Sequence, residues 1–521
     1  MRRLTALILA VFLAGCTPSP GTENDGGGES TTPGHTADNI TLSMRPPDTM
    51  HPLYTGQKSN TMIYGLIYDS LVNVDHTLRP APYLAESCTF SDDRKTIKFK
   101  LKEGITWHDG TPFTSNDVYY TFSKIKNPEF PCIYTERLNV VEYITVLDTL
   151  HFNIKLSKPY VNILNLLDFP IIPAHISNLD ENPVGTGQYK FYEYQPKKLL
   201  RLVRNDAWTL DTLPEFAYLD VNLISTSTSE ASALKIGKLS AVIAEPKNLG
   251  EFGLTENIGS KGFPTLKYEF LGLNLKNAAL SAAEVRQAIS YALDRTSLLN
   301  DAYFGSGSTT VAPIPSFTWF YSSETGKPVL EPEHSAKLLA DNGWEDKNGD
   351  GVMERTSEEV TTSLRFSILV NEDNASRIKC AEMIAQNLKG IGVLANVKSV
   401  PFEDYEKMIL EGSYDIFMGG FDFSSNLDYQ FAFSSGGEKN YTGYSSPDMD
   451  LVIDALYTPI SDDEIKKAYL EFQYLFLKDL PVLGLFFLDD VLIHTSNISP
   501  PGKMSFSNIY KNINSWEFNV R

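Results

Sequence analysis

The sequence predicts a protein of the α/β class with more than one domain. The chain has 521 residues, of which 42% are hydrophobic and 12% aromatic, enough to build several packed cores. From Asn39 onward, short runs that alternate apolar and polar residues are interspersed with runs in which apolar residues recur at helical spacing. At roughly 100–200 residues per domain, this length predicts about two to four domains.

The strands and helices that support this prediction begin near the N-terminus. Residues 39–44 and 96–101 alternate in the manner of strands. Asp109 and Gly110 then form a predicted tight turn, because Asp-Gly is a favoured turn pair. Thr114 to Asp117 supply oxygen atoms that can cap the start of a helix running to Ile125.

Two more helices are predicted in the second half of the chain. Ser281 and Glu284 have the spacing of a capping box, and apolar residues recur at helical spacing as far as Leu293. Residues 376–388 form the other helix, which ends at Gly390, a residue suited to the C′ position.

The N-terminus is typical of a secreted, lipid-anchored protein. Arg2 and Arg3 precede an apolar run over residues 4–14, shorter than the roughly 20 residues that span a bilayer, so residues 1–15 are predicted to be a signal peptide. Residues 13–16 (LAGC) resemble the lipobox of bacterial lipoproteins. This resemblance implies that Cys16 carries a diacylglyceryl group; the alternative is an ordinary secretory signal with a chance cysteine. Two acyl chains suffice for stable anchoring.

Residues 16–37 are rich in Gly, Ser, Thr and Pro and are predicted to be a flexible linker after the lipidated cysteine. No later run approaches the length of a transmembrane helix, so the membrane is expected to be contacted by the lipid anchor only. Cys88, Cys132 and Cys380 would then remain, either as free thiols or with one Cys88–Cys132 disulfide.

The charge of the chain excludes one class of partner. There are 65 Asp and Glu residues against 45 Lys and Arg, for a net charge of −20. Phosphate binding needs concentrated Lys and Arg, so no nucleic acid is expected to bind.

Five stretches, in this order along the chain, resemble the family 5 extracellular solute-binding proteins, the peptide- and nickel-binding receptors of ABC importers. The resemblance spans residues from about 40 to 490, nearly the whole mature chain. The stretches are residues 101–118 (LKEGITWHDGTPFTSNDV), 184–191 (VGTGQYKF), 204–208 (RNDAW), 285–295 (VRQAISYALDR) and 388–392 (LKGIG).

The resemblance implies a two-lobed, periplasmic-binding-protein-like fold of the three-domain type, with a hinge and a ligand cleft between the lobes. Lobe 1 would contain domain I and domain II (residues 59–185), and lobe 2 would be domain III (residues 266–487). Domain I would be assembled from residues 38–58, 186–265 and 488–521.

Two crossovers between the lobes are expected near residues 268–275 and 480–487. Each holds a glycine inside an apolar strand, Gly272 and Gly484, where backbone freedom is greatest. These glycines are the predicted hinge positions; the alternative is that both segments are ordinary buried strands.

The implied function is capture of a solute outside the cytoplasm, in the periplasm or at the cell exterior. A ligand that contacts both lobes shifts the protein toward a closed state, which the permease recognises. An oligopeptide is the expected ligand and a monomer the expected state. The alternatives are a nickel chelate, heme or an oligosaccharide, and, in another class, an extracytoplasmic hydrolase.

In peptide-binding relatives, the segment after a Tyr-Asp strand carries an acid that pairs with the peptide amine. Here that segment begins at Tyr414, Phe421 matches the usual aromatic position, and Asp422 follows it directly, while Ser424 lies nearer the usual place of the acid. Asp422 or Asp428 could substitute for it; the alternative is a solvated loop acid. The other residues assigned to the ligand are Tyr54, Asn274 and Trp319.

No catalytic residue, cofactor or metal ligand is predicted. None of the eight His residues is spaced for a local zinc site, and there is no G-x-S-x-G or P-loop motif. Residues 346–351 (DKNGDG) look like half of a calcium loop, but Ser357 stands where calcium needs a Glu, so an Asx turn is predicted.

Overall fold

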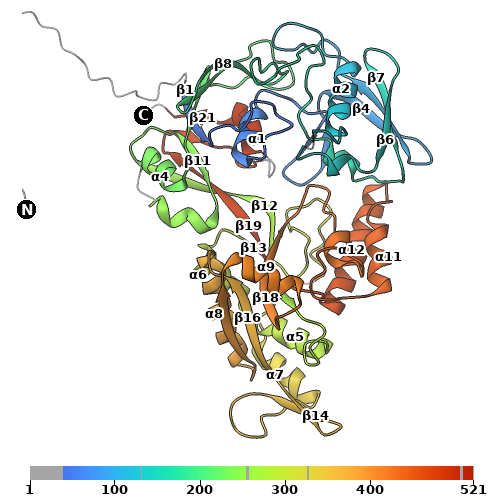
Figure 1. Ribbon diagram of the computed structural model, residues 1–521, viewed down its shortest axis with the longest axis vertical. Coiled ribbons are helices and arrows are strands. Elements are labelled where there is room, and N and C mark those ends of the chain that lie inside the picture. Colours follow the sequence, from blue (N-terminus) through green and yellow to red (C-terminus); the bar gives the residue numbers. More distant parts are fainter. Residues whose placement is uncertain (1–38, 131, 254–256, 326–327, 505–507, 520–521) are drawn as a thin grey trace, which may run out of the picture. The chain divides into compact units, whose positions relative to one another are not determined.

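The structure is a computed structural model that describes residues 39–519 apart from 131, 254–256, 326–327 and 505–507. The predicted signal peptide, Cys16 and the linker that follows it lie outside the described residues. Helices and strands alternate along the chain, which confirms the α/β class (Figure 1).

The first sheet has four strands in the order β1-β10-β9-β8. β1 runs parallel to β10, and the other neighbours are antiparallel. Its strands are β1 (Asn39–Met44), β8 (Tyr189–Gln195), β9 (Leu199–Arg204) and β10 (Tyr218–Leu223). β1 has the predicted bounds, and its alternate residues Ile40 and Leu42 are fully buried.

The second sheet also has four strands, in the antiparallel order β4-β5-β7-β6. Its strands are β4 (Ala85–Phe90), β5 (Thr96–Leu101), β6 (Val141–Val146) and β7 (His151–Leu156). β5 matches the predicted strand, with Phe99 stacked on its cross-strand neighbour Phe152 at 5.1 Å between ring centroids.

The predicted turn and helix that follow β5 are confirmed. Gly110 has a φ of +88° and donates from its N–H to the carbonyl of Trp107. α2 (Ser115–Ile125) begins after Thr114, whose N–H donates to the Asp117 carboxylate at 2.8 Å. The N-terminus of this helix is therefore stabilised as the sequence indicated.

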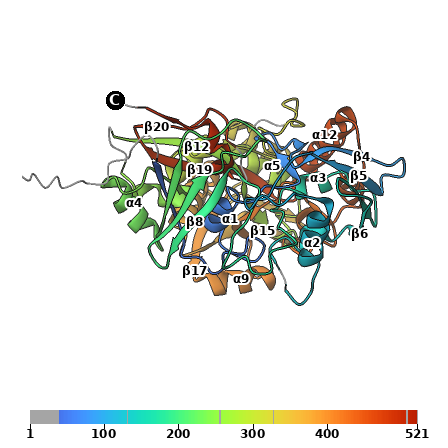
Figure 2. The ribbon, with the colours of Figure 1, turned by 90° about the horizontal axis from the view of Figure 1, so that it is seen from above.

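The largest sheet has seven strands, in the order β11-β19-β12-β18-β16-β17, with β13 attached to β19. Its strands are β11 (Ala241–Ala244), β12 (Ile258–Leu273), β13 (Gly307–Thr309), β16 (Arg365–Asn371), β17 (Leu394–Val400), β18 (Ile416–Asp422) and β19 (Leu483–Thr495). β12 and β19 lie side by side, as Figure 2 shows from above.

β12 and β19 change neighbours halfway along. Residues 258–264 of β12 pair with residues 489–495 of β19, the part of that strand that also carries β11. After a bulge between Pro264 and Lys267, β12 still pairs with β19 and also pairs with β18 on its other edge. These two strands therefore connect the elements around β1 and β11 with those around β16 and β18 (Figure 1).

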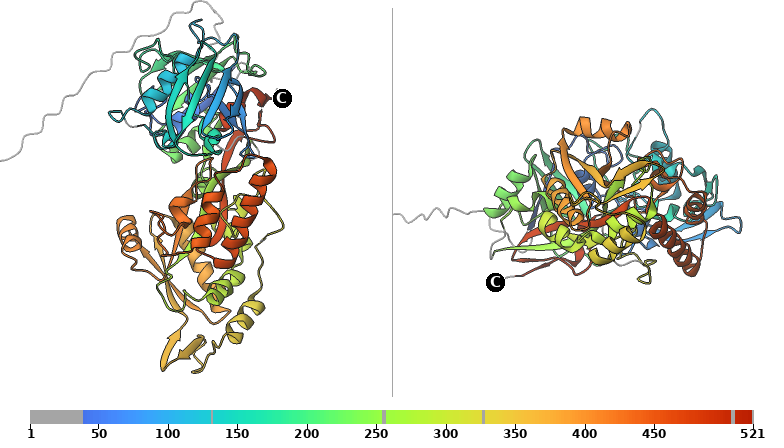
Figure 3. Two further views of the ribbon diagram at one scale, coloured as in Figure 1. Left: turned by 90° about the vertical axis from the view of Figure 1, so that its right-hand side faces the viewer. Right: turned by 90° about the horizontal axis from the view of Figure 1, so that it is seen from below.

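Helices surround the second half of this sheet. Val285 and Ile289 of α5 share a buried core with Ile384 and Leu388 of α8, and α11 and α12 pack on each other (Figure 3). These helices are α5 (Ala283–Ala292), α6 (Arg295–Tyr303), α7 (Pro332–Asp341), α8 (Ala375–Lys389), α9 (Phe402–Leu410), α10 (Gln430–Phe433), α11 (Pro447–Ala455) and α12 (Asp462–Asp479).

The helices predicted from Ser281 and from residues 376–388 are confirmed, but the capping box at Ser281 is wrong. α5 begins at Ala283, and Ser281 donates instead to the carbonyl of Ala278. Glu284 is drawn to Arg355, 3.0 Å away, so it does not reach back to the helix start. α8 stops before Gly390 as predicted, although that glycine keeps a right-handed φ of −62°.

The remaining elements are short. They are α1 (Lys58–Tyr64), α3 (Ile163–Leu166), α4 (Ser227–Lys235), β2 (Val72–Val74), β3 (Pro80–Pro82), β14 (Glu354–Ser357), β15 (Val360–Ser363), β20 (Ile498–Ser499), β21 (Glu517–Phe518) and the 3-10 helices Glu136–Leu138, Pro246–Glu251 and Ile509–Ser515. No helix within the described ranges is long and apolar enough to cross a membrane.

Two local predictions are settled by the structure. Cys88, Cys132 and Cys380 are all free, so the disulfide alternative is not realised. Asp346 accepts hydrogen bonds from the N–H groups of Gly349 and Gly351, both at 2.8 Å, which confirms the Asx turn.

Candidate functional site

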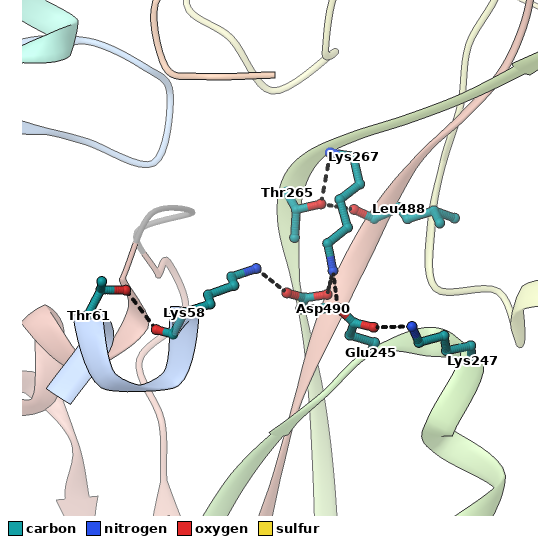
Figure 4. A network of polar contacts seen from close by, with 8 residues as sticks. All are labelled: Lys58, Thr61, Glu245, Lys247, Thr265, Lys267, Leu488 and Asp490. Carbon is teal, nitrogen blue, oxygen red and sulfur yellow. Dashed lines mark hydrogen bonds and ion pairs between the residues drawn. The ribbon is translucent and has the colours of Figure 1, made fainter. Parts of the chain in front are cut away.

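A network of charged side chains lies where β12 and β19 change neighbours (Figure 4). The carboxylate of Asp490 on β19 is 2% exposed and binds two lysines, Lys267 of β12 at 2.8 Å and Lys58 of α1 at 3.1 Å. Lys267 also binds Glu245 at 3.0 Å, and Glu245 binds Lys247 at 3.0 Å. The network thus links α1 and the segment after β11 to β12 and β19, which we call the crossing strands.

These ion pairs shift the titration of the groups that they join. Burial acts to raise the pKa of Glu245, but the charges of Lys267 and Lys247 outweigh it and lower that pKa to about 2. Burial acts to lower the pKa of Lys267, and the carboxylates of Asp490 and Glu245 raise it instead. Both groups stay charged at neutral pH, so the network is ionic.

Asp422, at the end of β18, lies within the field of this network. Desolvation raises the pKa of its carboxyl group, the nearby charges of Lys58 and Lys267 act to lower it, and Asp490 and Glu245 act to raise it. The Asp422 side chain remains exposed. An exposed carboxylate is therefore available to a ligand beside the crossing strands.

A pocket of about 420 Å³ opens on the α1 side of the network. We call it the Lys58 pocket; the charged groups among its lining residues are three bases and three acids. They are Arg45, Lys58, Lys247, Glu230, Glu245 and Asp490. Its volume is in the range of small-molecule sites, roughly 300–1,000 Å³.

A second pocket, of about 340 Å³, lies on the β18 side, and we call it the Phe421 pocket. Six of its lining side chains are aromatic: Phe270, Phe402, Tyr405, Phe417, Phe421 and Tyr441. Arg377 also lines it and binds Glu269 through two hydrogen bonds of 2.7 and 2.8 Å. The pocket can thus bury an apolar group beside a fixed ion pair.

The end of β18 has one edge without a strand partner, of which residues 420–422 reach the surface while Met418 and Gly419 are buried. All of β18 pairs with β12 on one side, but only Ile416 and Phe417 pair with β16 on the other. Within the described ranges, no strand covers residues 418–422 on that side, where the Met418 carbonyl accepts the Tyr405 hydroxyl. An extended ligand could add to this edge by backbone hydrogen bonds.

The structure brings two of the predicted ligand residues together, Phe421 and Asp422, at this edge. Ser424 is exposed two residues farther on, and its backbone carbonyl accepts the N–H of Leu427. Asp428 accepts the hydroxyl of Tyr457 at 2.7 Å, a local contact.

The other predicted residues lie elsewhere. Tyr54 stacks on His51, with 4.2 Å between ring centroids. Asn274 donates to the carbonyls of Gly412 and Tyr414, which occupies both of its amide hydrogens in a turn. The ring of Trp319 lies under the guanidinium of Arg79 at 4.0 Å.

The two glycines proposed as hinges stand in tightly packed positions. A Cβ atom on Gly272 would lie 2.1 Å from the Phe417 ring. On Gly484 it would lie 2.6 Å from the Tyr268 hydroxyl oxygen. Close packing therefore accounts for glycine at both places.

Sequence reasoning missed Lys58, Glu245, Lys267, Asp490 and Arg377. For two of them a signal was present, since Lys267 and Asp490 place charges next to apolar runs within their strands. A buried charge needs a partner, so each pointed to a polar site. Within the described part of the chain, no group of three or more His, Cys, Asp or Glu side chains is placed to hold a metal ion.

The sequence of this chain is similar to those of characterised proteins. The family model described as bacterial extracellular solute-binding proteins, family 5 Middle, matches residues 79–443. The oligopeptide-binding protein AppA of Bacillus subtilis is 24% identical over 95% of this chain and 96% of that protein.

Solved structures share the fold. A nickel ABC transporter protein from Bacillus halodurans superposes with a TM-score of 0.80 at 19% identity, covering 92% of this chain and 100% of that one. The structure of AppA from B. subtilis with a nonapeptide gives 0.65 at 22% identity, covering 92% and 99%. The chain therefore has the two-lobed α/β fold of these proteins.

Proposed function

Because this chain belongs to the bacterial extracellular solute-binding proteins of family 5, we propose that it captures an oligopeptide between its two lobes and delivers it, unaltered, to the permease of an ABC importer. AppA, which is similar to 95% of this chain, is named an oligopeptide-binding protein, and its solved structure contains a bound nonapeptide. The protein would work outside the cytoplasm as a monomer, held to the membrane by a lipid on Cys16.

One observation supports a peptide in particular: the open edge of β18 ends in Phe421 and Asp422. A peptide backbone can pair with such an edge, an apolar side chain can enter the Phe421 pocket, and a carboxylate can pair with the terminal amine. The three features lie within residues 418–422, so one extended peptide can use all of them.

Closure would occur about the crossing strands. β12 and β19 are proposed to connect lobe 1 with lobe 2, and both change neighbours at the bulge between Pro264 and Lys267. Since Gly272 and Gly484 are tightly packed, we place the hinge at this bulge and its partners, Leu488 and Asp489. A ligand that contacts both lobes would then stabilise the closed state.

Titration calorimetry tests the peptide assignment. Mixtures of random tripeptides and of random nonapeptides should release heat on binding, and Phe421→Ala should weaken the binding at least about tenfold, as expected for a buried aromatic anchor. Tyr474→Ala is the matched control, because that ring is 56% exposed on α12.

Two results would redirect the proposal. No heat with either peptide mixture, together with binding of a nickel–histidine complex or heme, would replace the peptide by one of those ligands. Cleavage of the peptides, seen by mass spectrometry after incubation, would show an enzyme instead of a receptor.

A further inference from the structure

A third pocket, which we call the Tyr68 pocket, has a volume of about 150 Å³. Its polar lining side chains are Thr61, Tyr68, Tyr134, Arg137, Asp168, Asn508 and Lys511. Met62 lines both this pocket and the Lys58 pocket. Residues 58, 61, 62 and 65 share one face of α1, so this face runs from the charged network to the Tyr68 pocket.

The Lys511 side chain is partly buried, and its amine has few partners. Among the described residues, its Nζ has one hydrogen bond, to the Ser70 hydroxyl at 3.4 Å. Burial lowers the pKa of Lys511, and the positive charge of Arg137 lowers it further. The carboxylates of Asp168 and Asp69 act to raise it but do not outweigh burial. An ammonium group has three donors, so Lys511 retains unused ones.

Arg137 and Tyr68 add further unused donors. The Arg137 guanidinium binds Asp168 through Nη1, and its carbon lies 5.0 Å from the centre of the Tyr134 ring. A guanidinium has five N–H groups, so most of them stay free. Tyr68 is 1% exposed, and its hydroxyl has no hydrogen-bond partner within the described ranges.

The pocket offers fewer acceptors than donors. Asn508 is held in place, because its Nδ2 donates to the Met62 carbonyl at 2.8 Å and its Oδ1 accepts the Tyr510 N–H at 3.0 Å. Asp168, whose side chain is 8% exposed, already serves Arg137. A group that enters this pocket must therefore bring acceptors, since buried donors without partners cost free energy.

We propose that the Tyr68 pocket binds one oxyanion group, a carboxylate or a phosphate. Such a group accepts several hydrogen bonds at once and pairs with Arg137 and Lys511 through charge-assisted ones. The volume accommodates a single group of this size and excludes a whole peptide. The oxyanion is either a free ion or the end of the transported solute, and only the second case rests on the proposed function.

The first experiment uses free ions. Sodium acetate and inorganic phosphate are titrated into the purified protein, with binding followed by NMR shifts and by thermal unfolding. Tyr68→Phe removes a hydroxyl that has no protein partner, so the variant should fold and should bind both ions at least about fivefold more weakly. Lys511→Met, a second variant, should weaken both ions further.

Tyr268→Phe is the matched control. Tyr268 is 0% exposed, and its hydroxyl also has no hydrogen-bond partner among the described residues, but it lines none of the three pockets. This control should bind the ions like the unaltered protein. The proposal would be overturned if the ions bound equally to the Tyr68→Phe, Lys511→Met and Tyr268→Phe proteins. It would also be overturned if the ions bound to none of these proteins and the second experiment showed no dependence on Tyr68.

The second experiment separates the two sources. Random tripeptides are compared as free acids and as C-terminal amides. If the solute supplies the group, amides bind about tenfold more weakly than acids, and Tyr68→Phe removes that difference. If the group is a free ion, acids and amides bind alike and the ion titrations still depend on Tyr68. Absence of all peptide binding with ion binding retained would defeat the proposed function and leave the oxyanion site standing.

Discussion

Asp489 and Asp490 are neighbours on β19, but their carboxylates meet opposite surroundings. Successive residues of a strand point to opposite faces of the sheet. Asp490 faces two lysines, whereas the Asp489 carboxylate has no hydrogen-bond partner among the described residues. Burial, with the nearby charge of Asp490, raises the pKa of Asp489 to about 6.

This shift predicts a pH-dependent effect of Asp489→Asn. The folded-state pKa lies above the usual value of 3.8, so the ionised carboxylate destabilises the fold above about pH 6, and this cost vanishes below pH 3.8. The unfolding free energy of the variant should therefore exceed that of the unaltered protein by about 1–3 kcal/mol at pH 7.5. Urea unfolding should show the gain shrinking toward pH 4.

Asp92→Asn is the control for that measurement, because Asp92 is exposed in a turn. It should change the unfolding free energy little at either pH. A gain at Asp489 that is the same at both pH values would contradict the assigned cause.

Asp422 should act on the charge of the ligand. Asp422→Asn keeps the size of the side chain and removes its charge, so peptides with a free amine should bind about tenfold more weakly. N-acetylated peptides should bind both proteins alike. Calorimetry with the two peptide forms checks this, and an equal loss for both would mean that Asp422 does not contact the amine.

At the scale of elements, the crossing strands depend on the buried carboxylate of Asp490. Asp490→Asn leaves Lys267 and Lys58 without their shared partner and should lower the unfolding free energy by about 3 kcal/mol. Lys58→Met should cost less than about 1 kcal/mol, because the Lys58 side chain is 53% exposed and water replaces the pair. Urea unfolding of both variants measures the two losses of unfolding free energy. Equal losses would argue against burial of Asp490 as the cause of the difference.

Local sequence patterns predicted the helices and strands well where residues close in sequence determine them. β1 and β5 were found from alternation, and α2 from the caps at its start. The capping box at Ser281 failed because Arg355, distant in sequence, attracts Glu284. The ion-pair network around Asp490 was not predicted for a similar reason. Lys58 and Asp490 are 432 residues apart, and no local pattern in the sequence indicates such a contact.

The candidate site shows the same limit. Phe421 and Asp422 were assigned because the resemblance placed them near a Tyr-Asp strand; they lie at the end of β18, and their contact with a ligand stays a prediction. Asn274, inside the predicted crossover at residues 268–275, was also assigned to the ligand, but its amide is used within a turn. Which polar residues face a ligand depends on the packing of distant strands, and that information is absent from a single segment.

At the scale of the whole molecule, hinge closure predicts a change in size. Small-angle scattering with a saturating peptide should give a smaller radius of gyration than the free protein, because the lobes rotate toward each other. Phe421→Ala, at the same peptide concentration, should show a smaller change. An unchanged radius at full occupancy would count against closure.

The lipid anchor is a separate prediction for the whole chain. Cys16→Ser should move the protein from the membrane fraction to the soluble fraction, because the remaining chain has no other predicted anchor. Cys88→Ser is the matched control and should stay with the membrane. Persistent attachment of the Cys16→Ser protein would require another means of binding.

The three free cysteines have a practical consequence. Cys88, Cys132 and Cys380 form no disulfide, and Cys380 lies on the buried face of α8. No covalent cross-link between these residues has to form during folding, so the body of the protein needs no oxidising machinery. Production of residues 39–521 in a reducing cytoplasm should therefore yield the same fold.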